Sequence, residues 1–521
     1  MKKLVIVLLA LFVLVIGTAK EETAYASENT ISGQAGDNVI WTYDWAGTLT
    51  FSGNGAMYNR EDCADYDGLL LIIGDEIKTV VVQEGITTLG DSIFEDLPIT
   101  KATLPSTLKT IGNKAFYLCT NLEIDTIPEG VEYIGDDAFQ YCESITSIKI
   151  PNSVQEIGDR AFRWCEKLHN ITIPNSVKTI GESVFHNCTS LTSVILPETI
   201  TTIGEYMFAN CTSLTSIILP ESITTIGMRA FQECSSLTEI YIPEGVTFIG
   251  RDAFQDCQSL IAITIPAGVT EISDEMLDGC YSLKDVKLSE GLSVIGAGAF
   301  CGCTSLEKLV IPNTVKTIKH TAFSSCESLT YLEIPNGVVS MEPYLFTGCK
   351  KLKSVTIPKS IKNLEYVFDG RHYVTDIYYN GTSSDWAKVK IDEYVKKIKI
   401  HFMEEAPKQD DESVKENDSN SQKNEVTDSS TENTTESIDG TTEETTEIVE
   451  GTEMIEGTEN IEESENIEET EATESTEEKD AVEDDEKQEP LIEKGMLVGG
   501  IVAAFSMSIG AVAIYLKKKK M

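Results

Sequence analysis

The stretch CTSLTSIILPESITTIGMRAFQE, residues 211–233, decides the fold, because the chain repeats it with changes every 23 residues. The clearest marker is a cysteine that returns at the same place in eleven consecutive copies. A fixed period of 20–50 residues is typical of repeat proteins, in which each copy forms one structural unit. The eleven cysteines, called the cysteine column below, are Cys119, Cys142, Cys165, Cys188, Cys211, Cys234, Cys257, Cys280, Cys303, Cys326 and Cys349.

Other positions keep the same period and predict how one copy folds. Phenylalanine recurs three residues before each column cysteine, with Leu277 as the exception. Ile148 and Ile150 flank Lys149, which is the alternation of a short strand, and Pro151 ends it. A short helical turn should follow from Gly158. Stacked copies bury one continuous core. The sequence therefore predicts an α/β-type repeat solenoid, right-handed, with one short parallel strand per 23-residue turn and short helical turns on the other side.

The copies resemble the BspA-like leucine-rich-repeat surface proteins. Their pattern, Cys-x-x-Leu-x-x-Ile-x-Ile-Pro followed by Ile-Gly-x-x-Ala-Phe, is carried here by Cys211, Leu214 and Pro220, then Ile226-Gly227 and Ala230-Phe231. The resemblance extends over roughly residues 75–370. It implies a leucine-rich-repeat fold and a role in adhesion at a cell surface.

The segments beside the repeats also resemble parts of that family. Residues 41–57, in which Leu49 and Phe51 alternate as in a half-buried strand, resemble the β-rich cap before the first repeat. Residues 376–382 with Trp386 resemble the closing cap. Caps are physically required, because the end turns would otherwise expose an open sheet edge and core face.

The two ends of the chain predict export and membrane anchoring. Residues 1–26 combine two lysines, a 13-residue apolar run and Ala24-Tyr25-Ala26, which suits a cleaved signal peptide; an uncleaved anchor helix is the alternative. Residues 495–516 are 22 uncharged residues, about 33 Å as a helix, which is enough to cross a bilayer. The four lysines that follow favour the cytoplasmic side. We therefore expect a single-pass cell-membrane protein with its bulk outside the cell.

An acidic segment separates the repeats from the predicted membrane helix. The chain carries 41 basic and 85 acidic residues, a net charge of −44, and residues 404–494 alone hold 35 acidic and 6 basic residues. Such a composition cannot bury enough apolar surface to fold, so it predicts a disordered stalk. A site for cations such as Ca²⁺ is the alternative. The overall acidity excludes a general nucleic-acid binder, which needs clustered Lys and Arg.

The predicted organisation is a series of segments with different roles. These are a signal peptide (1–26), an N-terminal β-rich cap (27–74), leucine-rich repeats (75–364), a C-terminal cap (365–402), a disordered acidic Glu/Thr-rich stalk (403–494), a transmembrane helix (495–516) and a cytoplasmic lysine tail (517–521).

No catalytic, metal or cofactor site is predicted. Thirteen cysteines in an exported chain normally suggest disulfides. Equivalent positions in successive turns, however, would give parallel Cβ vectors, so we expect a buried column of mostly free thiols. Cys63 and Cys301 lie outside the column. The five histidines form no zinc pair, and no nucleophile or phosphate-binding motif is present.

Two groups of residues are predicted to contact a ligand. Ile195, Ile218 and Tyr241 occupy the outward strand position in three consecutive copies and would form an apolar stripe; simple strand propensity is the alternative. Tyr141 and Trp164 occupy equivalent positions one copy apart, just before the column cysteine, and form the second candidate. The ligand would be an extracellular protein or glycan. A scaffold or substrate-capture component of a cell-envelope complex is the alternative function.

Overall fold

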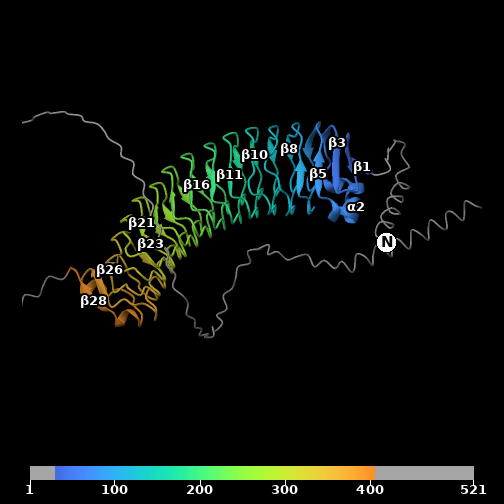
Figure 1. Ribbon diagram of the computed structural model, residues 1–521. Helices are drawn as coiled ribbons and strands as arrows, with labels where there is room; N and C mark the ends of the chain where they lie inside the picture. The colour runs from blue at the N-terminus through green and yellow to red at the C-terminus, as the bar shows by residue number, and fades with distance from the viewer. Residues whose placement is uncertain (1–29, 405–521) are drawn as a thin grey trace, which may run out of the picture. The chain divides into compact units, whose positions relative to one another are not determined.

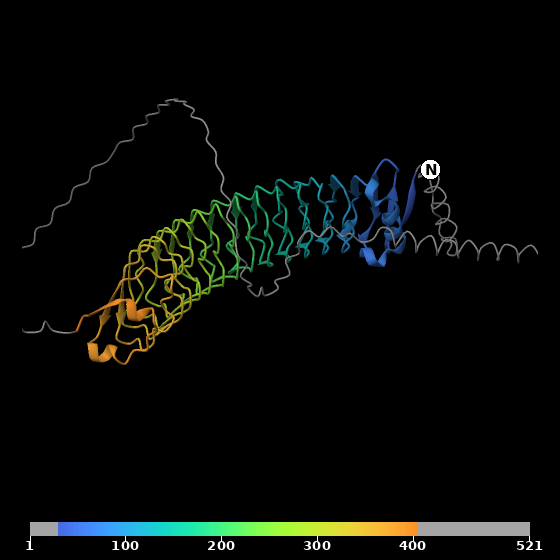
Figure 2. The same ribbon diagram turned by 90° about the horizontal axis from the view of Figure 1, so that it is seen from below.

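A computed structural model of the protein describes residues 30–404. The chain winds into successive turns that stack along a curved path (Figure 1, Figure 2). The predicted signal peptide, membrane helix and lysine tail lie outside the described residues, as does the predicted stalk beyond Glu404. Among residues 30–404, no helix is long and apolar enough to cross a membrane.

Each typical turn contributes two short parallel strands, whereas the sequence predicted one. In one turn these are β15 (Ser216–Ile218) and β16 (Thr225–Ile226). Strand β15 pairs with β17 of the next turn, which places Ile218 opposite Tyr241, and β16 pairs with β18. The second strand was missed because two residues are too short for a visible alternation. Its hydrogen-bond partners lie 23 residues away rather than nearby in sequence.

The strands form two columns along the stack, which we call the first and second sheets. The first sheet contains β5 (Thr79–Val82), β7 (Lys101–Thr103), β11 (Asn170–Thr172), β13 (Ser193–Ile195), β15, β17 (Glu239–Tyr241), β19 (Ala262–Thr264), β21 (Asp285–Lys287), β24 (Tyr331–Glu333) and β26 (Ser354–Pro358). The second contains β6 (Ile86–Leu89), β8 (Thr110–Ile111), β9 (Tyr133–Ile134), β10 (Glu156–Ile157), β12 (Thr179–Ile180), β14 (Thr202–Ile203), β16, β18 (Phe248–Ile249), β20 (Glu271–Ile272), β22 (Val294–Ile295), β23 (Thr317–Ile318) and β25 (Ser340–Met341).

The third side of each turn is not helical, which corrects the predicted short helical turns. It is a six-residue turn with two left-handed residues four positions apart, such as Tyr206 (φ 53°) and Asn210 (φ 57°). The N–H groups of Tyr206, Phe208 and Asn210 donate to carbonyl oxygens of the following turn at 2.7–2.9 Å. Because these donors bond to the next turn, they cannot close the i to i−4 bonds of a helix.

The N-terminal cap is a three-stranded antiparallel meander with one helix. Strands β1 (Ile31–Gly36), β2 (Val39–Tyr43) and β3 (Thr48–Gly53) pair in order, and β3 pairs in parallel with β5, the first strand of the stack. Leu49 and Phe51 on β3 are fully buried. The sequence did not predict helix α2 (Ala64–Ile73). Its neighbours are β4 (Gly55–Ala56) and the short 3₁₀ helices η2 (Arg60–Asp62) and η3 (Gly74–Glu76).

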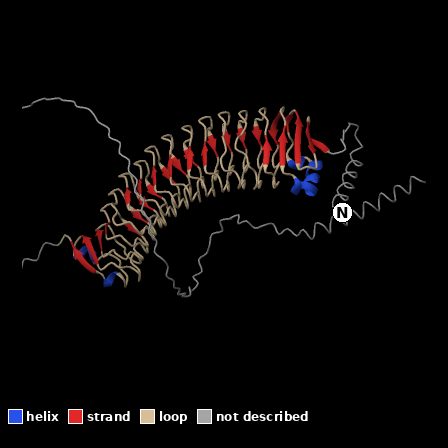
Figure 3. Ribbon diagram, viewed as in Figure 1, coloured by secondary structure: helices blue, strands red, loops and turns tan. Residues whose placement is uncertain are grey.

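The C-terminal cap continues the first sheet by two strands. Strand β27 (Asp376–Asn380) pairs with β26, and β28 (Lys399–Phe402) pairs with β27. Helix α3 (Ser383–Trp386) lies between them with the 3₁₀ helix η4 (Val395–Lys397), and the α-helices of the described part occur only in the two caps (Figure 3). Thr382 and Asp385 form a capping box at the start of α3, which satisfies two backbone donors.

A continuous core runs through all the turns. The recurring phenylalanines are fully buried and stack on one another from Phe116 to Phe254, with ring centroids 5.2–6.0 Å apart, and again from Phe300 to Phe346. Leu277 interrupts the stack, as the sequence indicates. The core therefore holds each turn mainly to its two neighbours, as expected for a repeat array.

Candidate functional site

The first candidate surface is an apolar stripe on the outer face of the first sheet. Ile195, Ile218 and Tyr241 end strands β13, β15 and β17, and 62%, 85% and 58% of their surfaces are exposed. Strand β17 is the hydrogen-bonded neighbour of β15, so Ile218 and Tyr241 are directly opposite. Polar residues border the stripe, since Thr172 precedes it and Thr264 follows it. A contiguous exposed apolar patch with a polar rim is typical of a protein contact surface.

The second candidate pairs Tyr141, which is buried, with Trp164, which is partly exposed. The two rings stack with centroids 5.7 Å apart, and Tyr117 packs edge-on against Tyr141 at the same distance. Only 7% of Tyr141 remains exposed, because its neighbours in the adjoining turns cover it. Both residues occupy the left-handed position before the column cysteine. Tyr141 therefore packs between turns and is not available to a ligand.

The cysteine column is buried, and every thiol in it has the same partner. Each Sγ–H donates to the carbonyl oxygen of the phenylalanine, or of Leu277, in the preceding turn at 3.0–3.3 Å. All thirteen cysteines are free thiols. Burial raises the pKa of each column thiol. Since the thiolate is the reactive form, the column provides packing and hydrogen bonds rather than chemistry.

We predict that thiol titration of the denatured, unreduced protein will count thirteen free thiols. In the folded protein the reaction should be slow at every position. Only Cys301 is partly exposed, and burial together with Asp278 raises its pKa to about 12. A count below six in the denatured protein, as disulfides between neighbouring column cysteines would give, would contradict this assignment.

A buried carboxylate lies on the turn side of the stack. Asp252 is fully buried, and one carboxylate oxygen accepts a hydrogen bond from Nε of Arg229 at 2.9 Å. Arg229 also donates to the Tyr206 hydroxyl at 2.7 Å, and Arg251 approaches Asp252 at 3.4 Å. Burial raises the pKa of Asp252 to about 6, although Arg229 opposes the shift. Tyr206, Arg229 and Asp252 therefore link three consecutive turns.

Asp252 should make stability depend on pH between about 4 and 6. Because this carboxyl binds its proton more tightly in the folded protein than in the unfolded chain, the free energy of unfolding falls as pH rises through this range. Relative to Asp252→Asn, the wild type should therefore gain up to about 3 kcal/mol of unfolding free energy as pH falls from about 7 to 4. Urea denaturation at both pH values measures the difference. Asp285→Asn, on the exposed face of β21, is the control. An equal change in pH dependence in this control would show that Asp252 is not its source.

Sequence reasoning missed a ladder of side-chain caps on the second sheet. In four successive turns the residue after the glycine that ends the second strand is Asp or Asn, and its Oδ1 accepts the backbone N–H of the equivalent residue in the next turn at 2.8–2.9 Å. The ladder runs through Asp91, Asn113, Asp136 and Asp159 and ends at the N–H of Glu182. The occurrence of only Asp or Asn at this position in four successive turns was the available clue.

The two sheets, the stacked core and the repeating turn define a class of protein, the leucine-rich-repeat solenoids. The family described as "BspA type Leucine rich repeat region (6 copies)" matches residues 74–169, 155–284 and 270–389. These matches cover more than half of the chain, and the chain belongs to this family. Among residues 30–404, no group of three or more His, Cys, Asp or Glu side chains could hold a metal ion.

Several solved structures are similar to this chain. A leucine-rich repeat protein from Bacteroides ovatus is 25% identical, over 68% of this chain and 100% of that chain, with a TM-score of 0.45. One from Eubacterium ventriosum is 24% identical, over 62% and 94%, with a TM-score of 0.44. A leucine rich cell surface protein from Faecalibacterium prausnitzii is 24% identical, over 72% and 99%, with a TM-score of 0.40. No curated protein matches the chain.

Proposed function

We propose that this chain is a membrane-anchored cell-surface protein that binds an extracellular protein and so mediates adhesion. The observation that carries the proposal is the apolar stripe of Ile195, Ile218 and Tyr241, which are exposed on three consecutive strands of a rigid sheet. A few side chains near the centre of an interface, with Tyr enriched among them, supply most of the binding energy between proteins. Anchorage and outward orientation rest on the sequences of residues 1–26 and 495–516.

The stripe predicts one sharply defined loss of function. Changing Ile195, Ile218 and Tyr241 together to serine should weaken binding of the partner about 100-fold, because the buried centre of the interface is lost. The probes are purified extracellular-matrix proteins and, for the scaffold alternative, fractionated envelope proteins. Binding is measured with the immobilised full chain.

A matched control lies on the same sheet face. Val310 is 80% exposed at the same repeat position, but its neighbours at that position are Lys287 and Glu333 rather than apolar residues. Val310→Ser should leave binding unchanged. Undiminished binding by the triple variant would remove the stripe as the contact surface. Retention of envelope components alone would favour the scaffold function.

A further inference from the structure

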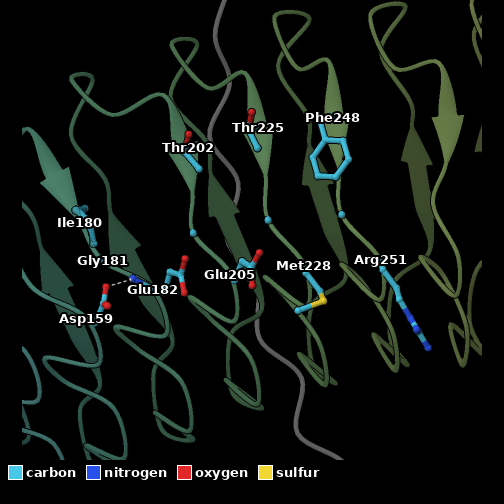
Figure 4. A pocket seen from close by; sticks show the side chains of 13 residues that line it. Asp159, Ile180, Gly181, Glu182, Thr202, Glu205, Thr225, Met228, Phe248 and Arg251 are labelled. Carbon is cyan, nitrogen blue, oxygen red and sulfur yellow. Dashed lines mark hydrogen bonds between the residues drawn. The ribbon is translucent and has the colours of Figure 1, made fainter. Parts of the chain in front are cut away.

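A groove of about 620 Å³ lies on the second sheet, beside the Ile-Gly pairs of four consecutive turns. Its floor is formed by the glycines of those pairs, which are Gly181, Gly204, Gly227 and Gly250. Figure 4 shows the two rows of side chains that border it. Thr202, Thr225 and Phe248 form one row, and Glu182, Glu205, Met228 and Arg251 form the other.

The groove begins where the ladder of Asp and Asn caps ends. Asp159 makes the last of four successive caps, to the N–H of Glu182, and the next four turns place Glu182, Glu205, Met228 and Arg251 at the cap position. These side chains do not cap the next turn. The surface that Asp and Asn fill elsewhere is therefore left open in these turns. The cap returns at Asp274, which accepts from the N–H of Ala297 at 2.8 Å.

The open floor presents backbone donors at regular intervals. No hydrogen bond among residues 30–404 uses the N–H of Glu205, Met228 or Arg251. A Cβ added to Gly227 would lie 2.7 Å from the nitrogen of Glu205, and one added to Gly250 would lie 2.5 Å from that of Met228. Glycine at these positions keeps the donors uncovered. A ligand with oxygen acceptors can replace water on these donors, and their regular arrangement fixes where its acceptors must lie.

One end of the groove is acidic. Glu182 and Glu205 form no ion pair with any described residue, whereas Arg251 at the other end is already paired with Glu275 at 3.1 Å. Burial, and then repulsion by Glu205 and Asp159, raises the pKa of Glu182. A cationic group placed between Glu182 and Glu205 would relieve this repulsion. The charge therefore complements a ligand that carries ammonium groups.

The spacing of these groups along the groove distinguishes two possible cationic ligands, an extended peptide and a linear glycan. Neighbouring turns are about 4.8 Å apart, so the donors and carboxylates repeat at that interval. An extended peptide places side chains on one face only about every 6.7 Å, which does not match. A sugar ring in a linear β-linked glycan advances by nearly one turn spacing. Successive rings turn over, but each ring carries oxygen atoms on both of its edges, so every turn can meet an acceptor. Phe248, which is 54% exposed, provides an apolar face at the end of the row.

We propose that this groove binds a linear glycan of amino sugars, with one ring on each turn. Ring oxygens and hydroxyls accept from the free N–H groups of Glu205, Met228 and Arg251, and Thr202 and Thr225 contribute hydroxyl groups. Glu182 and Glu205 bind an ammonium group. The proposal goes beyond the proposed function, because it adds a second ligand class on the other sheet.

The test is calorimetric titration of the full chain with a β-1,4-linked glucosamine hexamer, in mildly acidic buffer at about 0.15 M salt. Glu182→Gln with Glu205→Gln should weaken binding about tenfold or more, because charge-assisted hydrogen bonds are lost. Thr202→Val with Thr225→Val should also weaken it. Glu198→Gln with Glu221→Gln removes the same charge from neighbouring exposed positions outside the groove and should have no effect.

Each alternative gives a different result. Equal loss in the Glu198/Glu221 control would show general attraction to an acidic chain and overturn the proposal. Groove-dependent binding of hexalysine as tight as that of the glycan would assign a cationic peptide instead. The serine variant of Ile195, Ile218 and Tyr241 should bind the glycan normally. Absence of glycan binding while that stripe still captures a protein would remove this inference and leave the proposed function intact.

Discussion

Replacing Phe231 by alanine is expected to lower the free energy of unfolding by ~3–5 kcal/mol and to divide the stack into two blocks. Phe231 is fully buried, and its ring stacks at 5.4 Å on both Phe208 and Phe254. The rigid turns on either side cannot close the cavity, because their spacing is set by two hydrogen-bonded sheets. In a linear array the loss also weakens both neighbouring interfaces.

Urea denaturation followed by amide hydrogen exchange measures both effects. The amides of β15 and β17, which flank the substitution, should lose protection, and turns distant from it should retain theirs. Phe248→Ala is the matched control, since this phenylalanine lies one turn further on but is largely exposed. Its effect should stay within about 0.5 kcal/mol. A single cooperative transition with uniform loss of protection would contradict the division into blocks.

The repeat period was sufficient to predict the stack and its buried columns. Positions that recur every 23 residues must occupy equivalent places, so the period alone assigns phenylalanine and cysteine to the interior. The structure buries every member of both columns. The outward position of Ile195, Ile218 and Tyr241 follows from the same register, and the structure exposes all three.

Features that depend on contacts between turns could not be predicted in this way. The second strand of each turn has two residues. The six-residue turn on the third side is held by backbone hydrogen bonds to the next turn. These bonds hold residues such as Tyr141 and Trp164 in left-handed conformations that their side chains disfavour. Tyr141 was therefore expected on the surface, although the turn geometry buries it.

The groove illustrates how a local change becomes visible only in three dimensions. Replacement of Asp by Glu at residue 182 is conservative in charge, but one extra methylene group removes the cap on the next turn. Because Glu182, Glu205 and Met228 make no cap, the N–H groups of Glu205, Met228 and Arg251 have no hydrogen-bond partner among residues 30–404. The sequence contains the substitutions, but their consequence depends on the neighbouring turn.

The N-terminal cap should fail locally when its central tyrosine is removed. Tyr66 on α2 is fully buried, its ring packs edge-on against Phe51 at 5.7 Å, and its hydroxyl donates to the carbonyl oxygen of Ile93 at 2.7 Å. Tyr66→Ala removes this packing and leaves the Ile93 carbonyl without a donor. We expect a loss of ~3–5 kcal/mol in the stability of the cap.

The consequence is confined to one end because each turn contacts only its neighbours. Amides of β3 and β5 should exchange rapidly in Tyr66→Ala, whereas those of β15 and β17 remain protected, since local opening needs less free energy than global unfolding. Tyr66→Phe keeps the ring and loses only the hydrogen bond, so its loss should be about 1–3 kcal/mol. Simultaneous loss of protection at β3 and β17 would show instead that the cap controls the whole stack, which the nearest-neighbour contacts argue against.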